Sequence, residues 1–117
     1  MYQICKQFTF SASHILEGLP EEHPCSRLHG HNYVVELVLE SAKLDATGFV
    51  VDYGDLTKFD DMLKSEFDHR HLNDVVDMQT SAENLARYFY GRASKIWPSV
   101  SAVRVSETVR TWAEYRA

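Results

Sequence analysis

Three histidines and one cysteine lie close together in the first third of the chain. Their types suit a metal centre beside a reactive thiol. His14 is followed by Cys25, and Cys25 by His29 and His31 in the run Cys-Ser-Arg-Leu-His-Gly-His. Zinc in catalytic sites typically takes three protein ligands and keeps a fourth position open, and three neutral imidazoles leave the ion's charge available to polarise a bound group. The pattern therefore indicates a catalytic metal site.

Other interpretations of these residues stay open. Any one of the three histidines, taken alone, fits a hydrogen-bonded histidine of a small core. Cys25 fits a fourth ligand that would make a closed, structural zinc site. However, only three residues separate it from His29, and a chain of this length needs no metal to fold. We favour a free nucleophile or base for Cys25.

Two alternating segments are expected to bring the histidines together. Apolar side chains alternate in Ile4–His14, with Lys6 as the exception, and His29–Glu40 is rich in β-branched and aromatic residues. This pattern predicts two strands. On the second strand His29 and His31 project from the same face, roughly 6.6 Å apart along the strand. Two imidazoles so placed can converge on one ion.

The segment between these strands predicts a hairpin. Gly18–Pro24 is polar and contains two of the residues that most often occur in turns. A hairpin would return His14 toward the second pair of histidines. Cys25, which follows this loop, is then expected at the rim of the site.

Two helices are expected after the hairpin. Asp52 is a good N-cap for the first, and Thr80-Ser81-Ala82-Glu83 has the pattern of a capping box for the second, which Pro98 ends. Apolar residues recur at helical spacing in both segments. They are Leu56, Phe59, Met62, Leu63 and Phe67 in the first, and Leu85, Phe89, Ala93 and Ile96 in the second.

Two more alternating segments close the chain and complete the expected fold. Val100–Glu107 and Val109–Tyr115 predict strands, so the order is strand, strand, helix, helix, strand, strand. This order predicts an α+β fold with a four-stranded antiparallel sheet and both helices on one face. The other face and the sheet edges stay uncovered, so self-association is expected.

Length and composition limit the class of protein. Residues 1–117 are expected to form a single domain, and 44% hydrophobic with 25% charged residues is typical of soluble globular proteins. The first twenty residues contain no signal peptide or membrane span, so we expect a cytoplasmic enzyme with Cys5 and Cys25 as free thiols. A net charge of −5 argues against nucleic acid or an anionic membrane as the main partner.

Two further sites carry groups that could do chemistry. Asp68 could orient His69 for proton transfer, or the pair could be a solvated helix end. Glu107 ends an otherwise apolar strand face, where it is either an exposed residue or a buried carboxylate that binds two adjacent N–H donors. Three residues stay without an assigned role: Cys5, His23 and His71.

Taken together, the motifs resemble the family of 6-pyruvoyltetrahydropterin synthase and 6-carboxytetrahydropterin synthase. The resemblance covers almost the whole chain. The motifs are Phe10-Ser11-Ala12-Ser13-His14, Cys25-x-x-x-His29-Gly30-His31-Asn32-Tyr33, Phe67-Asp68-His69 with Leu72-Asn73, Thr80-Ser81-Ala82-Glu83-Asn84-Leu85 and Val105-Ser106-Glu107-Thr108.

The resemblance implies a role for each group of candidate residues. It implies that the three histidines hold zinc, that Cys25 is the catalytic base and that Asp68 and His69 assist proton transfer. It implies that Glu107 anchors a pterin ring. The remaining substrate contacts that we expect are Arg27, as a candidate for the triphosphate, together with Thr80 and Ser81.

The resemblance also implies an assembly and a reaction. The family has the tunnelling fold, in which ββααββ subunits associate into a barrel, usually a homohexamer of two stacked trimers with active sites between subunits. The spacing Cys-x₃-His-Gly-His resembles that of the bacterial 6-carboxytetrahydropterin synthases of the queuosine pathway. They convert 7,8-dihydroneopterin triphosphate to 6-carboxy-5,6,7,8-tetrahydropterin, acetaldehyde and triphosphate. A pyruvoyl-forming synthase and a zinc-dependent pterin-binding protein without turnover are the alternatives.

Overall fold

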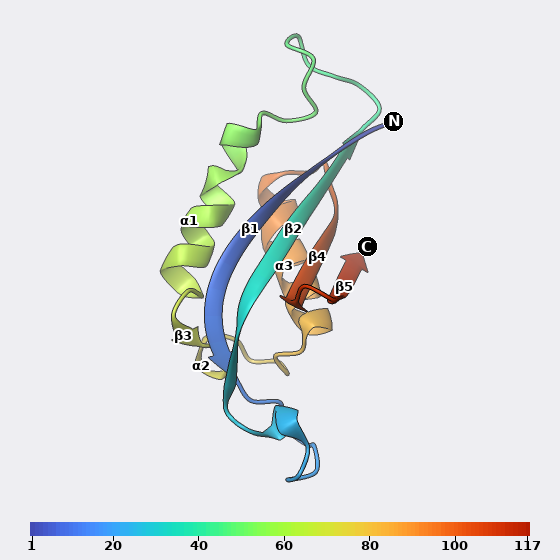
Figure 1. The fold of residues 1–117 in the computed structure, drawn as a ribbon. Helices are drawn as coiled ribbons and strands as arrows, with labels where there is room; N and C mark the ends of the chain where they lie inside the picture. The colour runs from blue at the N-terminus through green and yellow to red at the C-terminus, as the bar shows by residue number, and fades with distance from the viewer.

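A long antiparallel hairpin forms the centre of the fold (Figure 1). In a computed structural model that describes residues 1–117, β1 (Tyr2–His14) pairs with β2 (His29–Ser41) along its whole length. Tyr2 lies opposite Ser41 at one end, and His14 lies opposite His29 at the other. Side chains at alternate positions of both strands are buried where the hairpin meets the helices, which is the driving force for this register. The predicted hairpin is confirmed.

The sheet has one strand more than the sequence predicted. β4 (Val100–Thr108) pairs antiparallel with β2, and β5 (Thr111–Arg116) pairs antiparallel with β4. A fifth strand, β3 (Arg70–His71), pairs parallel with β1, so the order is β3-β1-β2-β4-β5 and the sheet is mixed. The prediction of four antiparallel strands was wrong in this respect, because a two-residue strand is too short to show an alternating pattern.

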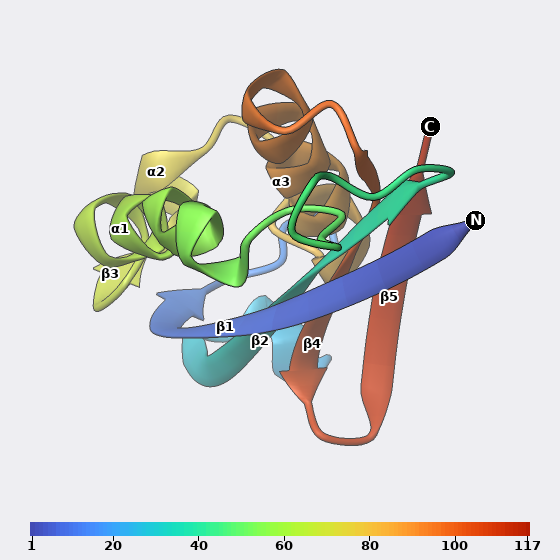
Figure 2. The same cartoon turned by 90° about the horizontal axis from the view of Figure 1, so that it is seen from above.

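Three helices cover one face of the sheet. They are α1 (Thr57–Glu66), α2 (Leu72–Val75) and α3 (Ala82–Ile96). Figure 2 shows all three on the same side of the strands, and no helix on the other side. The predicted one-sided arrangement is confirmed, with the single-turn helix α2 as an addition. No helix combines the length and apolar character needed to cross a membrane.

The two long helices, α1 and α3, both begin later in the chain than their capping patterns predicted. The Asp52 side chain accepts a hydrogen bond from the N–H of Gly54 at 2.8 Å, but it caps a short 3-10 helix (Tyr53–Leu56) that precedes α1. The N-cap of α3 is Ser81, whose hydroxyl accepts from the N–H of Asn84 at 3.2 Å. Thr80 therefore lies outside the helix and is free for another contact.

The core lies between the helices and the covered face of the sheet. Phe10 stacks on Tyr33 with 4.8 Å between ring centroids, and Phe89 of α3 contacts Phe10 edge-on at 6.0 Å. The predicted face of α3 is buried except at its last position. Ile96 is 51% exposed, and Trp97, the residue after the helix, is buried instead.

The uncovered face of the sheet is polar. Glu36 on β2 accepts a hydrogen bond from Arg104 on β4 at 3.1 Å, and Arg104 lies 3.7 Å from Glu114 on β5. The guanidinium of Arg104 also lies 4.8 Å from the ring centroid of Trp112. These charges cross three neighbouring strands, so this face carries an ion-pair network rather than an apolar layer.

Candidate metal centre

The strand register brings the three predicted histidine ligands to one point. His14 lies opposite His29 in the hairpin, and His31 follows two residues later on the same face. The ring centroids of His14 lie 4.5 Å from His29 and 5.2 Å from His31, and those of His29 and His31 are 4.9 Å apart. One ligand atom from each of these residues and from Glu107 lies within 4.8 Å of all the others, so the four could hold a metal ion.

Hydrogen bonds to backbone carbonyls fix which ring nitrogen faces this point. His14 Nδ1 lies 2.9 Å from the carbonyl oxygen of Thr80, and His29 Nδ1 lies 2.7 Å from that of Arg27. A carbonyl only accepts, so each Nδ1 must carry the hydrogen, and the lone pair of each neutral ring is on Nε2. Such bonds to the second nitrogen are typical of histidines that ligate metals.

Two buried nitrogen atoms in the group have no hydrogen-bond partner. They are the Nε2 atoms of His14 and His31. Glu107 Oε2 lies 3.4 Å from the first and 2.9 Å from the second, but neither contact has the geometry of a hydrogen bond. Buried polar atoms are rarely left unpaired. Imidazole nitrogens and carboxylate oxygens are both ligands of zinc, so these residues fit a bound metal.

The protonation states in the group also suit a cation. Burial lowers the pKa of His31 and outweighs the attraction of Glu107, so the ring favours its neutral, ligating form. The contact with His14 lowers the pKa of Glu107 against the opposing effect of burial. Its carboxylate therefore remains ionised near neutral pH.

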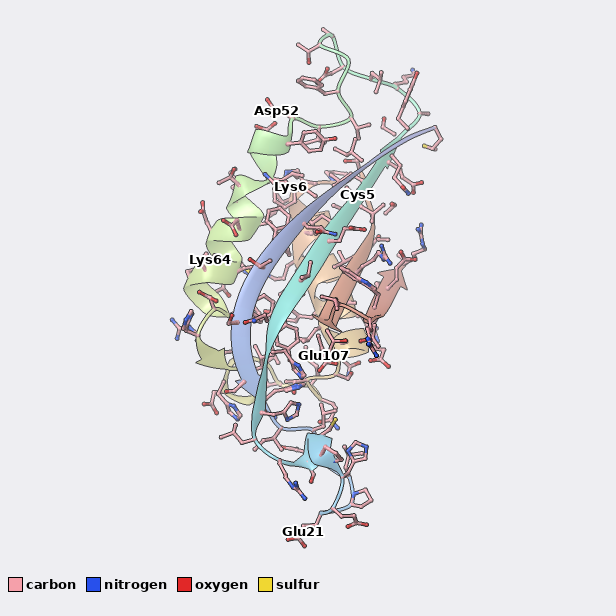
Figure 3. The ribbon with its side chains drawn as sticks, in the orientation of Figure 1. Cys5, Lys6, Glu21, Asp52, Lys64 and Glu107 are labelled. Atoms are coloured by element: carbon pink, nitrogen blue, oxygen red, sulfur yellow. The ribbon has the colours of Figure 1, made fainter.

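Glu107 belongs to the group of candidate metal ligands and also lines a neighbouring cavity. Figure 3 shows it near the end of β4, well away from Cys5 along the sheet. It lines a cavity of about 300 Å³ between β4, β5 and the start of α3, together with Trp112 and Glu83. The structure thus brings the predicted pterin anchor to the histidines and shows it as a possible fourth ligand, which the sequence had not indicated.

Cys25 lies in a short 3-10 helix, Pro24–Ser26, in the loop that joins β1 and β2. Its N–H donates to Nδ1 of His23 at 3.1 Å, and its carbonyl accepts from the N–H of Leu16 at 2.9 Å. The thiol is free and partly exposed, and Cys5 is free as well, as predicted. His23, which had no predicted role, caps this turn.

The predicted Asp68–His69 pair is present. Asp68 Oδ2 lies 2.9 Å from His69 Nδ1, and its other oxygen accepts from the N–H of Ser11 at 2.8 Å. Both hydrogen bonds lower the pKa of Asp68, and the one from the N–H of Ser11 has the larger effect. The imidazole is 82% exposed and lines a hollow of about 490 Å³ that also reaches His31, but Cys25 does not line that hollow.

The three predicted substrate contacts have different surroundings. Thr80 is fully buried, and its hydroxyl lies 3.0 Å from His14 Nδ1, so its position favours a role in orienting that ring. Ser81 caps α3. The side chain of Arg27 is exposed and lines a surface hollow with Glu21 and Glu22.

Sequence reasoning missed the groups that orient the imidazoles. They are the backbone carbonyls of Thr80 and Arg27, and a carbonyl leaves no trace in residue type. The sequence indicated Thr80 as part of a capping pattern and as a substrate contact, but not as a partner of His14. The contacts between Thr80 and His14 span 66 residues, so no local spacing reports them.

Comparisons with known proteins agree with this fold. The family profile described as 6-pyruvoyl tetrahydropterin synthase matches residues 3–117. A 6-carboxy-5,6,7,8-tetrahydropterin synthase of Synechocystis is 31% identical over 98% of this chain and 93% of its own. The human 6-pyruvoyl tetrahydrobiopterin synthase is 32% identical over 91% of this chain and 85% of its own. The solved 6-pyruvoyl tetrahydropterin synthase of Caenorhabditis elegans superimposes with a TM-score of 0.86 at 26% identity, over 99% and 95% of the two chains. The chain therefore belongs to the 6-pyruvoyl tetrahydropterin synthase family.

Proposed function

We propose that this protein is a cytoplasmic, zinc-dependent lyase of queuosine biosynthesis. Its reaction converts 7,8-dihydroneopterin triphosphate to 6-carboxy-5,6,7,8-tetrahydropterin and releases acetaldehyde and triphosphate. The observation that carries the proposal is the convergence of three imidazoles, two of them fixed through Nδ1, with Cys25 in the loop that joins their two strands. The three-residue spacing between Cys25 and His29 and the relative from Synechocystis support the 6-carboxy product.

The imidazoles would hold the metal through their Nε2 atoms. A bound zinc ion would supply Lewis-acid polarisation of the hydroxyl groups on the substrate side chain. His14 and His29 keep their orientation through Thr80 and Arg27, so the site is organised before a ligand arrives. Because Glu107 also lines the neighbouring cavity of about 300 Å³, its carboxylate can bind two N–H groups of a pterin ring there.

Proton transfer would involve two groups. Cys25 would act as the base that removes a proton from the substrate side chain, and His69 would return one. Asp68 holds His69 through Nδ1, which leaves Nε2 to exchange the proton. Cys25 and His69 do not share a hollow in one chain, so we propose that a second copy brings them together. A homohexamer of two trimers, with active sites between subunits, would do so.

The remaining substrate contacts are assigned by position. Arg27 is exposed and follows Cys25 by two residues, so we propose that it meets the triphosphate. Ser81 would contact substrate from the start of α3. Nucleic acid and membranes play no part in the proposed reaction.

The test is incubation of the zinc-loaded protein with 7,8-dihydroneopterin triphosphate, followed by identification of the products. We expect 6-carboxy-5,6,7,8-tetrahydropterin, acetaldehyde and triphosphate. Triphosphate with a 6-pyruvoyl product and no acetaldehyde would instead show the pyruvoyl-forming activity. Binding of the pterin without any loss of substrate would show a binding protein and contradict the proposal.

A further inference from the structure

The segment that follows β1 is held from one side by two side-chain amides. Asn73 Oδ1 accepts from the N–H of Ile15 at 2.9 Å, and Asn73 Nδ2 donates to the carbonyl of Ile15 at 2.9 Å. Gln79 makes the same pair of bonds with Glu17: Oε1 accepts from its N–H at 3.0 Å, and Nε2 donates to its carbonyl at 2.7 Å. Both polar backbone groups of both residues are therefore paired.

These two side chains take the place of a neighbouring strand. A strand pairs the N–H and the carbonyl of every second residue with one partner, and Ile15 and Glu17 are two residues apart. Among side chains, only the amides of Asn and Gln offer one donor and one acceptor side by side in the manner of a peptide group. Asn73 and Gln79 supply this pattern from the connection that leads through α2 to α3.

The opposite side of the same segment supports Cys25. Leu16 lies between the two clamped residues, and its N–H donates to the carbonyl of Cys25 at 2.9 Å. The N–H of Cys25 is bonded to His23, so both backbone groups of Cys25 have fixed partners. A displacement of Leu16 would thus move the turn that carries the thiol.

We propose that Asn73 and Gln79 are positioning residues that set the place of Cys25 relative to the three imidazoles. The inference rests on the proposed role of Cys25 as the base. Proton abstraction is sensitive to distance, and a displacement of about 1 Å can lower a rate by roughly a hundredfold. The clamp borders an open hollow of about 610 Å³ that Glu17, Asn73 and Gln79 line, so truncation of either amide leaves no enclosed cavity and should leave the fold intact.

The experiment compares Gln79→Ala and Asn73→Ala with Gln7→Ala in the zinc-loaded enzyme. Gln7 is the matched control because its amide also makes a long-range hydrogen bond, to Glu36 at 3.1 Å on the uncovered face. We expect kcat to fall about tenfold or more in both clamp variants, with KM and zinc content unchanged. The amide of Leu16 should exchange with deuterium faster, and Gln7→Ala should change none of these values.

Several results would overturn the proposal. An unchanged kcat despite faster exchange at Leu16 would show that the clamp does not affect the base. If zinc content fell in proportion to kcat, the substitutions would act through the candidate ligand His14 rather than through Cys25. Gln79 is exposed, so Gln79→Ala is expected to keep the fold, and circular dichroism checks this. The proposal therefore stays testable with Gln79→Ala even if Asn73→Ala unfolds.

A separate measurement keeps this proposal distinct from the proposed function. If the unaltered protein turns over no substrate, the proposed function fails. The clamp is then tested by the rate at which iodoacetamide alkylates Cys25, followed by peptide mass mapping. We expect faster alkylation of Cys25 in Gln79→Ala and no change in Gln7→Ala. Equal rates in all three proteins would overturn the clamp itself.

Discussion

Thr80 holds His14 through two atoms at once. Its carbonyl oxygen lies 2.9 Å and its hydroxyl 3.0 Å from the same ring nitrogen, Nδ1. Both residues are fully buried, so water does not compete for these contacts. The pair links the end of β1 to the start of α3, and it fixes the tautomer of one of the three candidate ligands.

Removal of one of these two contacts tests their effect on the metal. Thr80→Val keeps the size of the side chain and removes only the hydroxyl, so His14 should retain its tautomer but lose part of its restraint. We expect the dissociation constant for zinc to rise about tenfold. Competition with a chelator measures it. Thr57→Val, which removes a hydroxyl bonded to the Gly54 carbonyl at 2.7 Å far from the site, should leave zinc affinity unchanged.

Metal analysis tests the ligand set directly. The protein should bind about one zinc per chain, because its three imidazoles converge on one point. His29→Ala should lose that zinc together with turnover. His71→Ala is the matched control, since His71 contacts Ser13 at 3.0 Å and is not part of the metal group. Full zinc content in His29→Ala would contradict the three-histidine site.

The two cysteines offer a test of base against ligand. Cys25→Ala should retain zinc and lose most turnover, because the base is removed while the imidazoles stay. Cys5→Ala should retain both, since Cys5 lies toward the other end of the sheet from Glu107 (Figure 3). Elemental analysis and product formation measure the two effects. Loss of zinc in Cys25→Ala would identify this thiol as a fourth ligand.

Glu107 has two possible partners, and one substitution separates them. Glu107→Gln exchanges one acceptor oxygen for an N–H₂ group, which leaves donors of a pterin ring unpaired at a cost of roughly 2–4 kcal/mol. We expect affinity for a pterin ligand to fall about a hundredfold or more while zinc content stays the same. Calorimetric titration measures the affinity. Normal pterin affinity with reduced zinc content would instead assign Glu107 to the metal.

An ion pair between α1 and α3 should make stability depend on pH. Arg92 donates to both carboxylate oxygens of Glu66, at 3.1 and 2.8 Å, and these bonds lower the pKa of Glu66. A lowered pKa means that the stabilisation is present above the usual pKa of a glutamate and is lost as the pH falls through the lowered value. The pair is half exposed, so Glu66→Gln should cost at most about 1 kcal/mol near pH 7.

Denaturant unfolding of both proteins at two pH values measures this effect. The difference between the unaltered protein and Glu66→Gln should shrink as the pH falls through the lowered pKa of Glu66, because the protonated carboxyl is then uncharged like the amide of Gln. A difference that persists unchanged at acid pH would show that packing, rather than charge, is responsible.

The sequence was sufficient for the strands that carry the ligands. Alternation in β1 and β2 follows from burial of one face, and the same period places His29 and His31 on one side. The pairing of His14 with His29 then follows from the register of a hairpin. The fold class and the one-sided helices also came from local patterns, because each element buries a face of its own.

Features that depend on distant contacts were not predictable in this way. β3 forms because Arg70 reaches Ala12 of β1, a contact across 58 residues that leaves no periodicity in a two-residue strand. The start of α3 was ambiguous because Thr80 and Ser81 are both good N-caps. Packing decided between them, since Thr80 is bonded to His14 and Ser81 remained to cap the helix.

His69 has a backbone φ of 59°, in the left-handed region that glycine adopts without steric cost. A residue with a Cβ atom is less stable there by about 1 kcal/mol. Asp68 bonds the imidazole from one side, and the side chain is otherwise exposed, so packing returns little of that difference. Selection for thermal stability alone would favour glycine at this position. Under the proposed role of His69 in proton transfer, stability and chemistry pull in opposite directions at residue 69: the position carries an imidazole at the expense of a less stable backbone.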